Sequence, residues 1–208
     1  MPDRAAFARP APEVAPLLLG ARLTHRTPDG AVTVRLTEVE AYQGQGEDPG
    51  SHAHRGRTAR NAVMFGEPGH LYTYFTYGMH TCANVVCLPP GSAGGVLLRG
   101  AEVLDGLELA RSRRTTSRGD ADLARGPARL ALALGITLDD GGADLLAGDA
   151  FTLDLADEPV GTVRTGPRTG VSGPGGDAAA YPWRFWLEGD PTVSSYRSAV
   201  ARRRVAKA

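Results

Sequence analysis

The chain has 208 residues, 42% of them hydrophobic, and its 23 basic side chains balance 23 acidic ones. A chain of this length folds as one ordinary domain and needs no disulfide or metal to hold its core, so its two cysteines do not form a disulfide framework. No apolar stretch is long enough for a signal peptide or a membrane span, and we expect no membrane partner. Zero net charge argues at first against a polyanionic ligand.

The charges are segregated along the chain. Residues 1–130 carry 15 Arg and 13 acids, residues 131–163 carry seven acids and no base, and residues 164–208 carry eight bases and three acids. Arginine accounts for 22 of the 23 bases, and its planar guanidinium matches the geometry of phosphate. Two interpretations stay open, an Arg-rich composition with solvated charged faces or a basic surface for a polyanion.

The amino-terminal half reads as a helix followed by two hairpins. Gly20 closes the helix, and Pro28-Asp29-Gly30 joins the first pair of strands. A loop rich in glycine and charge separates the hairpins, and Tyr77-Gly78-Met79 forms the second turn. The predicted elements are a helix over 12–19, strands over 22–27 and 31–42, a loop over 43–67, and strands over 71–76 and 80–88.

The second half groups its helices between short strands. Leu104 and Leu107 begin a helix that ends in an Arg run, and Pro127 opens another that Gly135 closes. The predicted strands are 96–99, 151–155 and 183–187, with a Gly/Pro-rich loop over 160–180. Hairpins with grouped helices predict an α+β fold, a single domain over residues 1–200 with a curved antiparallel sheet and flanking helices, followed by a basic tail over 201–208.

The strand over 31–42 carries two carboxylates, Glu38 and Glu40, at even positions. The even positions begin apolar at Val32, Val34 and Leu36, so alternation places both acids on the core face. A carboxylate there is costly unless it is paired or lies at the mouth of a cavity, where it can act as a general base. The alternative, which this strand alone favours, is a strand end that emerges into water.

Aromatic and basic residues follow this strand. Tyr72 and Tyr74 share one face of the second hairpin, and Tyr77 at its tip has little to pack against. The tip therefore resembles a wedge that proteins push between base pairs, whereas Tyr72 reads as a core residue. Three arginines lie in the preceding loop, where residues 51–66 contain no acid. Aromatic residues interleaved with arginine are typical of a nucleic-acid site.

These motifs, in this order and spacing, resemble the alkyladenine (methylpurine) DNA glycosylase family over residues 17–196. The most specific part is the tyrosine hairpin that follows the Glu-Ala-Tyr strand. The matching residues are Glu38-Val39-Glu40-Ala41-Tyr42, Glu47-Asp48, His52, Arg60-Asn61, Met64-Phe65, Pro68-Gly69, Tyr72, Tyr74, Tyr77-Gly78-Met79, Cys82, Asn84, Val96 to Arg99, Gly126-Pro127 and Arg184-Phe185. His80, Thr81 and Ala83 depart from the family, which has larger side chains after the tip.

The resemblance implies an enzyme that flips damaged purines out of duplex DNA and hydrolyses the N-glycosidic bond. By this resemblance, Glu40 is the general base that activates water, and Arg99 is its partner. The damaged base then lies against Tyr42, His52 and Tyr74, with Asn84 disfavouring the exocyclic amine of guanine. The predicted DNA-intercalating residues are Tyr77, Met79 and Met64.

Several assignments keep an alternative. Spacing cannot decide between Glu38 and Glu40 as the base, and Glu38 is the candidate for a structural ion pair. His54 competes with His52, two residues away in the same loop. Met64 and Met79 are also suited to core packing.

The remaining predictions concern DNA contacts and chemistry. The candidates for backbone contacts are Arg55, Arg57, Arg60, Arg125 and Arg129, the last two beside the helix opened by Gly126-Pro127, although a plain helix cap explains that motif equally well. The spacing of Cys82 and Cys87 predicts no metal site, and no cofactor is expected. The sole lysine is Lys207, which disfavours a Schiff base with the sugar and predicts a monofunctional enzyme.

We therefore expect a DNA glycosylase for 3-methyladenine, 7-methylguanine, hypoxanthine or ethenoadenine in double-stranded DNA, which initiates base excision repair. The expected protein is a monomer in the cytoplasm, associated with the nucleoid if bacterial and nuclear if eukaryotic. Two rival functions stay open. One is a lesion-binding module without turnover, and the other is a nucleoside or glycoside hydrolase that uses Glu38 and Glu40.

Overall fold

The computed structural model describes residues 2–76, 78–158 and 160–199. Three α-helices lie in this part of the chain: α1 (Ala11–Leu18), α2 (Leu107–Arg113) and α3 (Pro127–Leu134). Single turns of 3-10 helix lie at Arg4–Ala6, Ala62–Phe65, Asp120–Asp122, Leu138–Asp140 and Pro174–Gly176. No helix among the described residues is long and apolar enough to cross a membrane.

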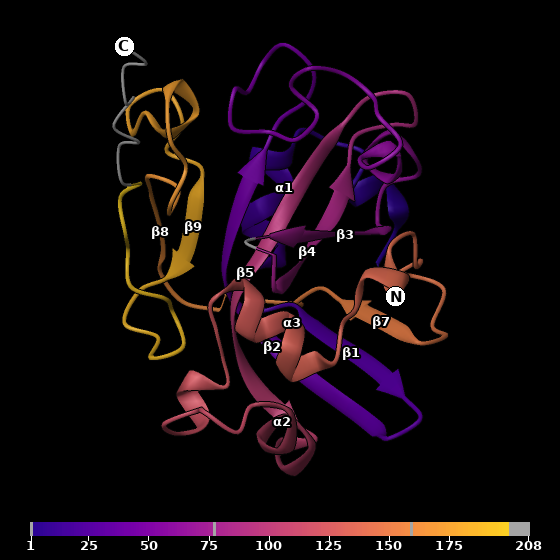
Figure 1. Cartoon of the computed structure of the whole chain (residues 1–208), viewed down its shortest axis with the longest axis vertical. Helices are drawn as coiled ribbons and strands as arrows, with labels where there is room; N and C mark the ends of the chain where they lie inside the picture. The colour runs from indigo at the N-terminus through magenta and orange to yellow at the C-terminus, as the bar shows by residue number, and fades with distance from the viewer. Residues whose placement is uncertain (1, 77, 159, 200–208) are drawn as a thin grey trace, which may run out of the picture.

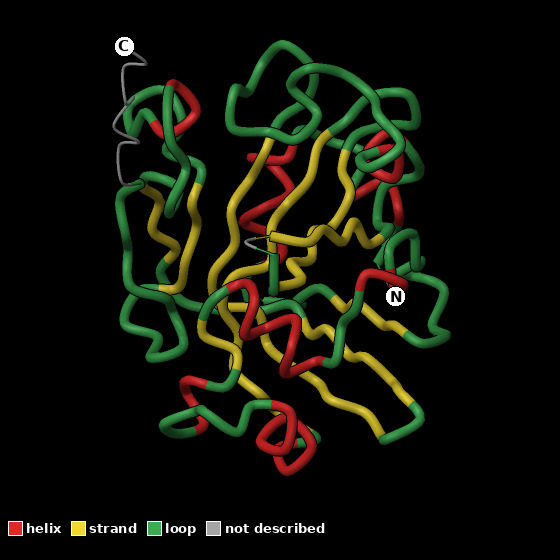
Figure 2. Tube along the Cα trace, viewed as in Figure 1, coloured by secondary structure: helices red, strands yellow, loops and turns green. Residues whose placement is uncertain are grey.

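One antiparallel sheet organises the fold (Figure 1). Its central path runs β3-β4-β5-β2-β1-β7, with β6 added to β5 and the β8–β9 hairpin added to β2 through β9. Figure 2 shows that long loops join the strands at one end of the molecule. The strands are β1 (Arg22–Thr27), β2 (Gly30–Tyr42), β3 (Leu71–Thr76), β4 (His80–Cys87), β5 (Gly94–Asp105), β6 (Ala124–Arg125), β7 (Phe151–Asp154), β8 (Val163–Gly166) and β9 (Arg184–Leu187).

The main hydrophobic core joins helices α1 and α3 to the sheet. Leu18 from α1 and Leu130 and Leu134 from α3 are fully buried there with apolar residues of β2, β4 and β5. A second, smaller cluster lies under the loop that follows β2 and consists of Ala53, Met64, Tyr72, Val86 and Ala93. The β3–β4 hairpin contributes to both clusters, and it is therefore buried on both faces near its base. The prediction of an α+β fold with an antiparallel sheet, hairpins and flanking helices is confirmed.

Strand β2 changes its alternation half-way along. Its core positions are even as far as Leu36 and then odd, because Val39 and Ala41 continue the same buried cluster. The β2–β5 register shifts on both sides of Glu38, which marks a local irregularity in the ladder. The prediction that Glu38 and Glu40 continue the apolar face is therefore wrong, because the irregularity turns both carboxylates to the other side. They do not emerge into water either, since both are fully buried.

Element boundaries differ from the predictions mainly in the glycine-rich segments. Strand β5 starts at Gly94 and runs through Leu104 to Asp105, so the following helix begins only at Leu107. Gly100 is needed within this strand, because an added Cβ would lie 2.9 Å from the Thr192 carbonyl oxygen. The segment predicted as a loop over 160–180 contains strand β8. The first three residues of this strand are all exposed, so it lacks the alternation of apolar and polar residues that predicts a strand.

Candidate active site

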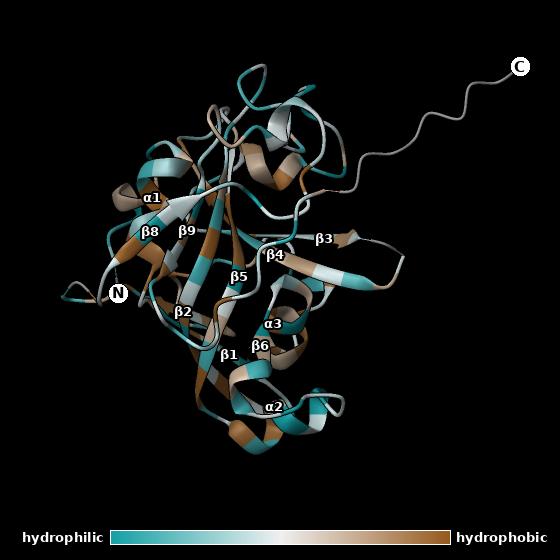
Figure 3. Ribbon diagram, turned by 90° about the vertical axis from the view of Figure 1, so that its left-hand side faces the viewer, coloured by the Kyte–Doolittle hydropathy of each residue, from teal (hydrophilic) through white to brown (hydrophobic). Residues whose placement is uncertain are grey.

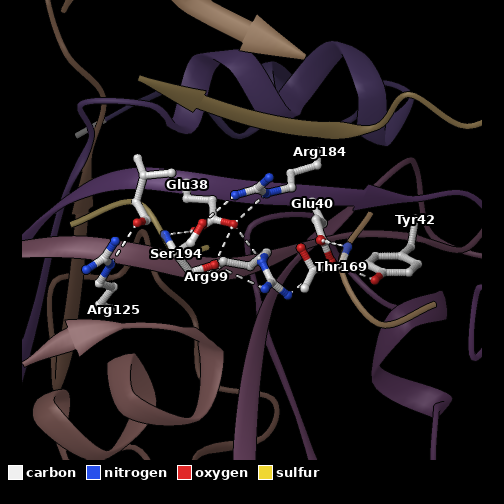
Figure 4. A network of polar contacts seen from close by, with 9 residues as sticks. Glu38, Glu40, Tyr42, Arg99, Arg125, Thr169, Arg184 and Ser194 are labelled. Carbon is white, nitrogen blue, oxygen red and sulfur yellow. Dashed lines mark hydrogen bonds and ion pairs between the residues drawn. The ribbon is translucent and has the colours of Figure 1, made fainter. Parts of the chain in front are cut away.

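Glu40, on strand β2 where it pairs with β5, belongs to a buried polar network (Figure 4). Its Oε2 accepts hydrogen bonds from the Tyr42 hydroxyl at 2.9 Å and from Arg99 Nη1 at 3.3 Å. Its Oε1 accepts the Thr169 backbone N–H at 2.6 Å. The structure brings Glu40, Tyr42 and Arg99 together, as the resemblance implies. The three residues that donate hydrogen bonds to Glu40, namely Tyr42, Arg99 and Thr169, all line one cavity.

Glu38 is bound more completely by cations than Glu40 is. Its Oε1 accepts from Arg99 Nε at 3.0 Å, from Arg184 Nε at 2.7 Å and from the Ser194 hydroxyl at 3.0 Å. The Ser194 backbone N–H donates to its Oε2 at 2.7 Å. Glu38 therefore joins strands β2, β5 and β9 to the carboxy-terminal segment, which is the structural ion-pair role left open by the sequence.

The network favours the charged forms of Glu38 and Arg99 and the neutral form of Tyr42. Burial alone would raise the pKa of Glu38, but Arg99 and Arg184 outweigh it, and the net result is a lowered pKa. Burial also disfavours the charged form of Arg99, yet Glu40 and Glu38 raise its pKa. Burial, with the charge of Glu40, raises the pKa of Tyr42 well above its ordinary value. Tyr42 therefore keeps its proton and donates it to Glu40 in a hydrogen bond.

The cavity beside this network has a volume of about 720 Å³, enough for a nucleobase and its sugar. Strands β3, β4 and β5 supply one wall, the start of helix α3 supplies another, and the segments around Thr169 and Ser194 complete it. Its lining includes Tyr42, His52, Met64, Tyr72, Tyr74, Cys82, Asn84, Leu97, Arg99, Arg125, Arg129 and Arg197. All four residues predicted for the base pocket are thus brought to one cavity.

His52 packs edge to face against Tyr72 and Tyr74, and these two tyrosine rings stack on each other with their centroids 5.8 Å apart. The rings of His52 and Tyr74 lie 4.5 Å apart at 82°, and His52 Nδ1 lies 3.1 Å from the Tyr72 hydroxyl. Burial and the charge of Arg60 lower the pKa of His52, which favours its neutral form. Asn84 donates through Nδ2 to the Tyr72 carbonyl oxygen at 3.1 Å. Of the two histidines considered, His52 lines this cavity and His54 does not.

The tip of the β3–β4 hairpin projects from the body of the protein (Figure 3). Met79 beside the tip is 69% exposed and Phe75 is 47% exposed. Tyr77, the predicted intercalating residue, lies outside the described residues. Met64 does not project with Met79, because it is buried in the smaller cluster and lines the cavity. The core-packing alternative therefore describes Met64, whereas Met79 is exposed beside the tip and its intercalating role stays a prediction.

The arginines predicted to contact DNA lie in two places. Arg125 and Arg129 line the cavity at the start of helix α3, where Arg125 Nε donates to the Val193 carbonyl oxygen and Arg129 pairs with Asp122. Arg60 Nη2 donates to the Phe75 carbonyl oxygen at 3.4 Å and thus lies beside the hairpin. Arg55 and Arg57 are exposed on the loop after β2, with no ion-pair partner among the described residues.

Sequence reasoning missed the residues that complete the network from the carboxy-terminal third. Thr169 and Ser194 come from segments that look like ordinary Gly- and Ser-containing loops. Arg184 belongs to the motifs that carry the family resemblance, but the sequence assigns it no role. Arg168, within the predicted 160–180 loop, is fully buried and pairs with Asp48. An arginine flanked by glycines and prolines gives no local signal of burial, because its partner lies 120 residues away.

Comparison with known proteins agrees with this geometry. The model of the methylpurine-DNA glycosylase (MPG) family matches residues 5–191. The chain belongs to the methylpurine-DNA glycosylase family. Its relatives include proteins that carry the provisional name 3-methyladenine DNA glycosylase. A protein of Leifsonia xyli subsp. xyli is 60% identical over 200 residues, covering 94% of this chain and 92% of the relative. One from Streptomyces avermitilis is 57% identical over 201 residues, covering 95% and 92%.

Membership confirms the resemblance seen in the sequence. As a member of this family, the chain is an enzyme of DNA repair, a hydrolase of N-glycosyl bonds whose substrate is DNA. The family match spans every strand of the sheet and every residue of the polar network around Glu38 and Glu40 except Ser194.

Proposed function

We propose that this chain is a monofunctional glycosylase that flips alkylated or deaminated purines out of duplex DNA and releases them by water attack on the N-glycosidic bond. The candidate bases are 3-methyladenine, 7-methylguanine, hypoxanthine and ethenoadenine. One observation carries the proposal: the buried Glu40–Arg99 pair adjoins a cavity lined by Tyr42, His52 and Tyr74. A carboxylate beside an aromatic pocket suits the hydrolysis of a nucleoside whose base is held by stacking.

Glu40 carries the chemical step in this proposal. A carboxylate that receives a proton from water generates the nucleophile that attacks the sugar C1′, and general-base catalysis contributes roughly 10²- to 10⁴-fold in rate. The same carboxylate stabilises the positive charge that develops on the sugar as the base departs. Arg99, anchored by Glu38, holds the Glu40 carboxylate in place and offers a cation to the neighbouring phosphate.

The cavity walls supply recognition of the base. A purine that enters between Tyr42, His52 and Tyr74 gains stacking, and a cationic alkylated purine also gains cation–π attraction. His52 stacks best as a neutral ring, which is the form that its lowered pKa favours. Asn84, on the cavity wall, opposes the exocyclic amine of an undamaged guanine.

The hairpin tip and the arginines account for DNA binding. Flipping a nucleotide costs a few kcal/mol, least for a damaged or mispaired base. Met79, together with Tyr77 two positions before it in the sequence, fills the space that the flipped nucleotide leaves in the stack. Arg55, Arg57, Arg60, Arg125 and Arg129 contact the backbone, since they lie on the loop and the helix start that flank the hairpin and the cavity.

A damaged-base panel tests the proposal. Duplexes that each carry one of the four candidate lesions are incubated with the protein, and the released base and the abasic site are measured separately. We expect a free base and an intact, alkali-labile strand, because no lysine lies near the motifs to cleave the strand through a Schiff base. Release from free nucleosides but not from duplexes would instead establish the nucleoside hydrolase.

A further inference from the structure

A fully buried ion pair lies directly behind Tyr42. Arg168 Nη1 lies 2.6 Å from Asp48 Oδ2, and Arg168 Nη2 lies 2.8 Å from Asp48 Oδ1, so the contact is bidentate. Both side chains have no exposed surface. A buried pair of this kind is retained at a desolvation cost, and well-packed apolar residues often serve as well for stability. The position of the Asp48–Arg168 pair behind Tyr42 therefore points to a role besides stability.

The guanidinium of Arg168 covers the ring of Tyr42. Its Cζ lies 4.5 Å from the ring centroid of Tyr42, and Tyr181 and Trp183 surround it at 5.2 and 5.5 Å. Tyr42 lines the cavity, whereas Arg168 does not. One face of the ring therefore carries a permanent cation, and the base that we propose to stack on Tyr42 takes the side toward the cavity.

A cation in this place acts on the charge of the base. A base stacked about 3.5 Å beyond the ring would lie roughly 8 Å from Arg168, where a bare guanidinium disfavours a cationic purine about tenfold or more. A neutral purine at the same place feels little of this field. Asp48 cancels the charge of Arg168 through its bidentate contact, and the cavity can then accept a cationic base.

We propose that the Asp48–Arg168 pair sets the preference of the cavity for cationic over neutral damaged purines, acting through the ring of Tyr42. The inference rests on the proposed function, because it assumes that the base stacks on Tyr42. The inference predicts opposite changes in this preference for the two single substitutions. Removal of the anion lowers the preference for a cationic base, and removal of the cation raises it.

The test measures single-turnover release of 7-methylguanine, a cationic base in the duplex, and of hypoxanthine, a neutral one. The two lesions occupy the same place in one duplex sequence, and the ratio of their rates is compared between proteins. Because both rates come from one preparation, the ratio does not depend on the fraction of active protein. The variants are Asp48→Asn, Arg168→Gln and the double variant, with Arg164→Gln, an exposed partner of Glu188, as the matched control.

We expect the ratio of 7-methylguanine to hypoxanthine release to fall about tenfold in Asp48→Asn and to rise several-fold in Arg168→Gln. The double variant buries no unpaired charge, and its ratio returns to within about twofold of the wild type, as does that of Arg164→Gln. If Asp48→Asn does not fold, the rise in Arg168→Gln and its reversal in the double variant decide the question.

Two other outcomes overturn the inference. The ratio stays unchanged in both single variants, or it moves in the same direction in both, as a merely structural effect on Tyr42 would cause. Failure of the proposed function is distinct from either, since the wild type would then release neither base.

Discussion

Glu38 and Arg99 form the tighter of the two ion pairs that Arg99 makes with strand β2, with Arg99 Nε 3.0 Å from Glu38 Oε1 and Nη1 3.3 Å from Glu40 Oε2. Glu38 also accepts hydrogen bonds from Arg184 and from the Ser194 backbone N–H, whereas Glu40 accepts its hydrogen bonds from residues that line the cavity. Two carboxylates two positions apart thus have separate tasks. Glu38 anchors two cations, and Glu40 is the carboxylate to which we assign the chemical step as a proposal.

The first prediction concerns Glu38→Gln and stability. The substitution leaves Arg99 and Arg184 buried with one anion fewer, and the free energy of unfolding at neutral pH falls by about 3–5 kcal/mol. Urea denaturation measures the loss, with Glu67→Gln, at an exposed position, as the control. A Glu38→Gln protein as stable as the wild type would show that the pair contributes nothing net.

The same residue predicts a pH dependence. The pKa of Glu38 is lower in the folded protein than its ordinary value of 4.5, so the unfolded chain binds the proton first. Its contribution to stability is complete above pH 4.5 and is lost as the pH falls through the lowered pKa. The wild type should therefore lose more stability than Glu38→Gln across this acidic range. Parallel curves for the two proteins would contradict the assignment.

A third prediction concerns the charge of His52. Burial and Arg60 lower its pKa from 6.5, so Arg60→Ala should raise the pKa of His52 toward that value. Titration of the ring by NMR measures the change, with Arg55→Ala in the same loop as the control. Because the folded pKa is the lower one, stability decreases as the pH falls through 6.5 toward it. An identical His52 pKa in Arg60→Ala and wild type would exclude Arg60 as a cause.

Met79→Ala tests the hairpin tip. Met79 is 69% exposed, so its truncation changes the free energy of unfolding by less than about 0.5 kcal/mol. Affinity for a lesion-bearing duplex should nevertheless fall roughly tenfold, because an apolar wedge into the stack is lost. Leu132→Ala is the matched control, an apolar side chain 49% exposed on helix α3. Equal affinities of the two variants would argue against a wedge at Met79.

The exposed arginines predict a salt dependence. If Arg55 and Arg57 each neutralise one phosphate, the double Ala variant should bind undamaged duplex with a log–log salt slope smaller by about 1.8. Fluorescence anisotropy at several salt concentrations gives the slope. Arg164→Ala, which removes an exposed cation on β8, should leave the slope unchanged. A wild type whose affinity does not vary with salt would count against the basic surface.

The sequence foresaw the local features of the site better than its assembly. Glu40, Tyr42 and Arg99 were found through a family resemblance and do meet, and alternation predicted the strands around them. Alternation failed at Glu38, because the irregular β2–β5 ladder reverses the two faces, a feature with no signature in one sequence. Arg168 was also missed, since burial of a charge depends on a partner remote in the chain.

Net charge was the least informative property of the chain. The segment over 131–163 carries seven of the acids, and none of its described residues lines the cavity. Two of the chain's arginines, Arg168 and Arg184, are buried in ion pairs away from the cavity and are unavailable to DNA. The arrangement of charge in the folded protein, and not the net charge, decides where the surface can bind a polyanion.

The most direct test of the account is single-turnover release of a damaged base by the wild type and by Glu40→Gln. Gln keeps an oxygen for the Thr169 N–H, and Arg99 keeps Glu38, so the variant should fold and bind a lesion-bearing duplex with near wild-type affinity. Because the amide cannot accept a proton from water, the rate of release should fall by roughly 10² or more. A Glu40→Gln protein that binds the duplex and releases the base as fast as the wild type would contradict the central role given to Glu40.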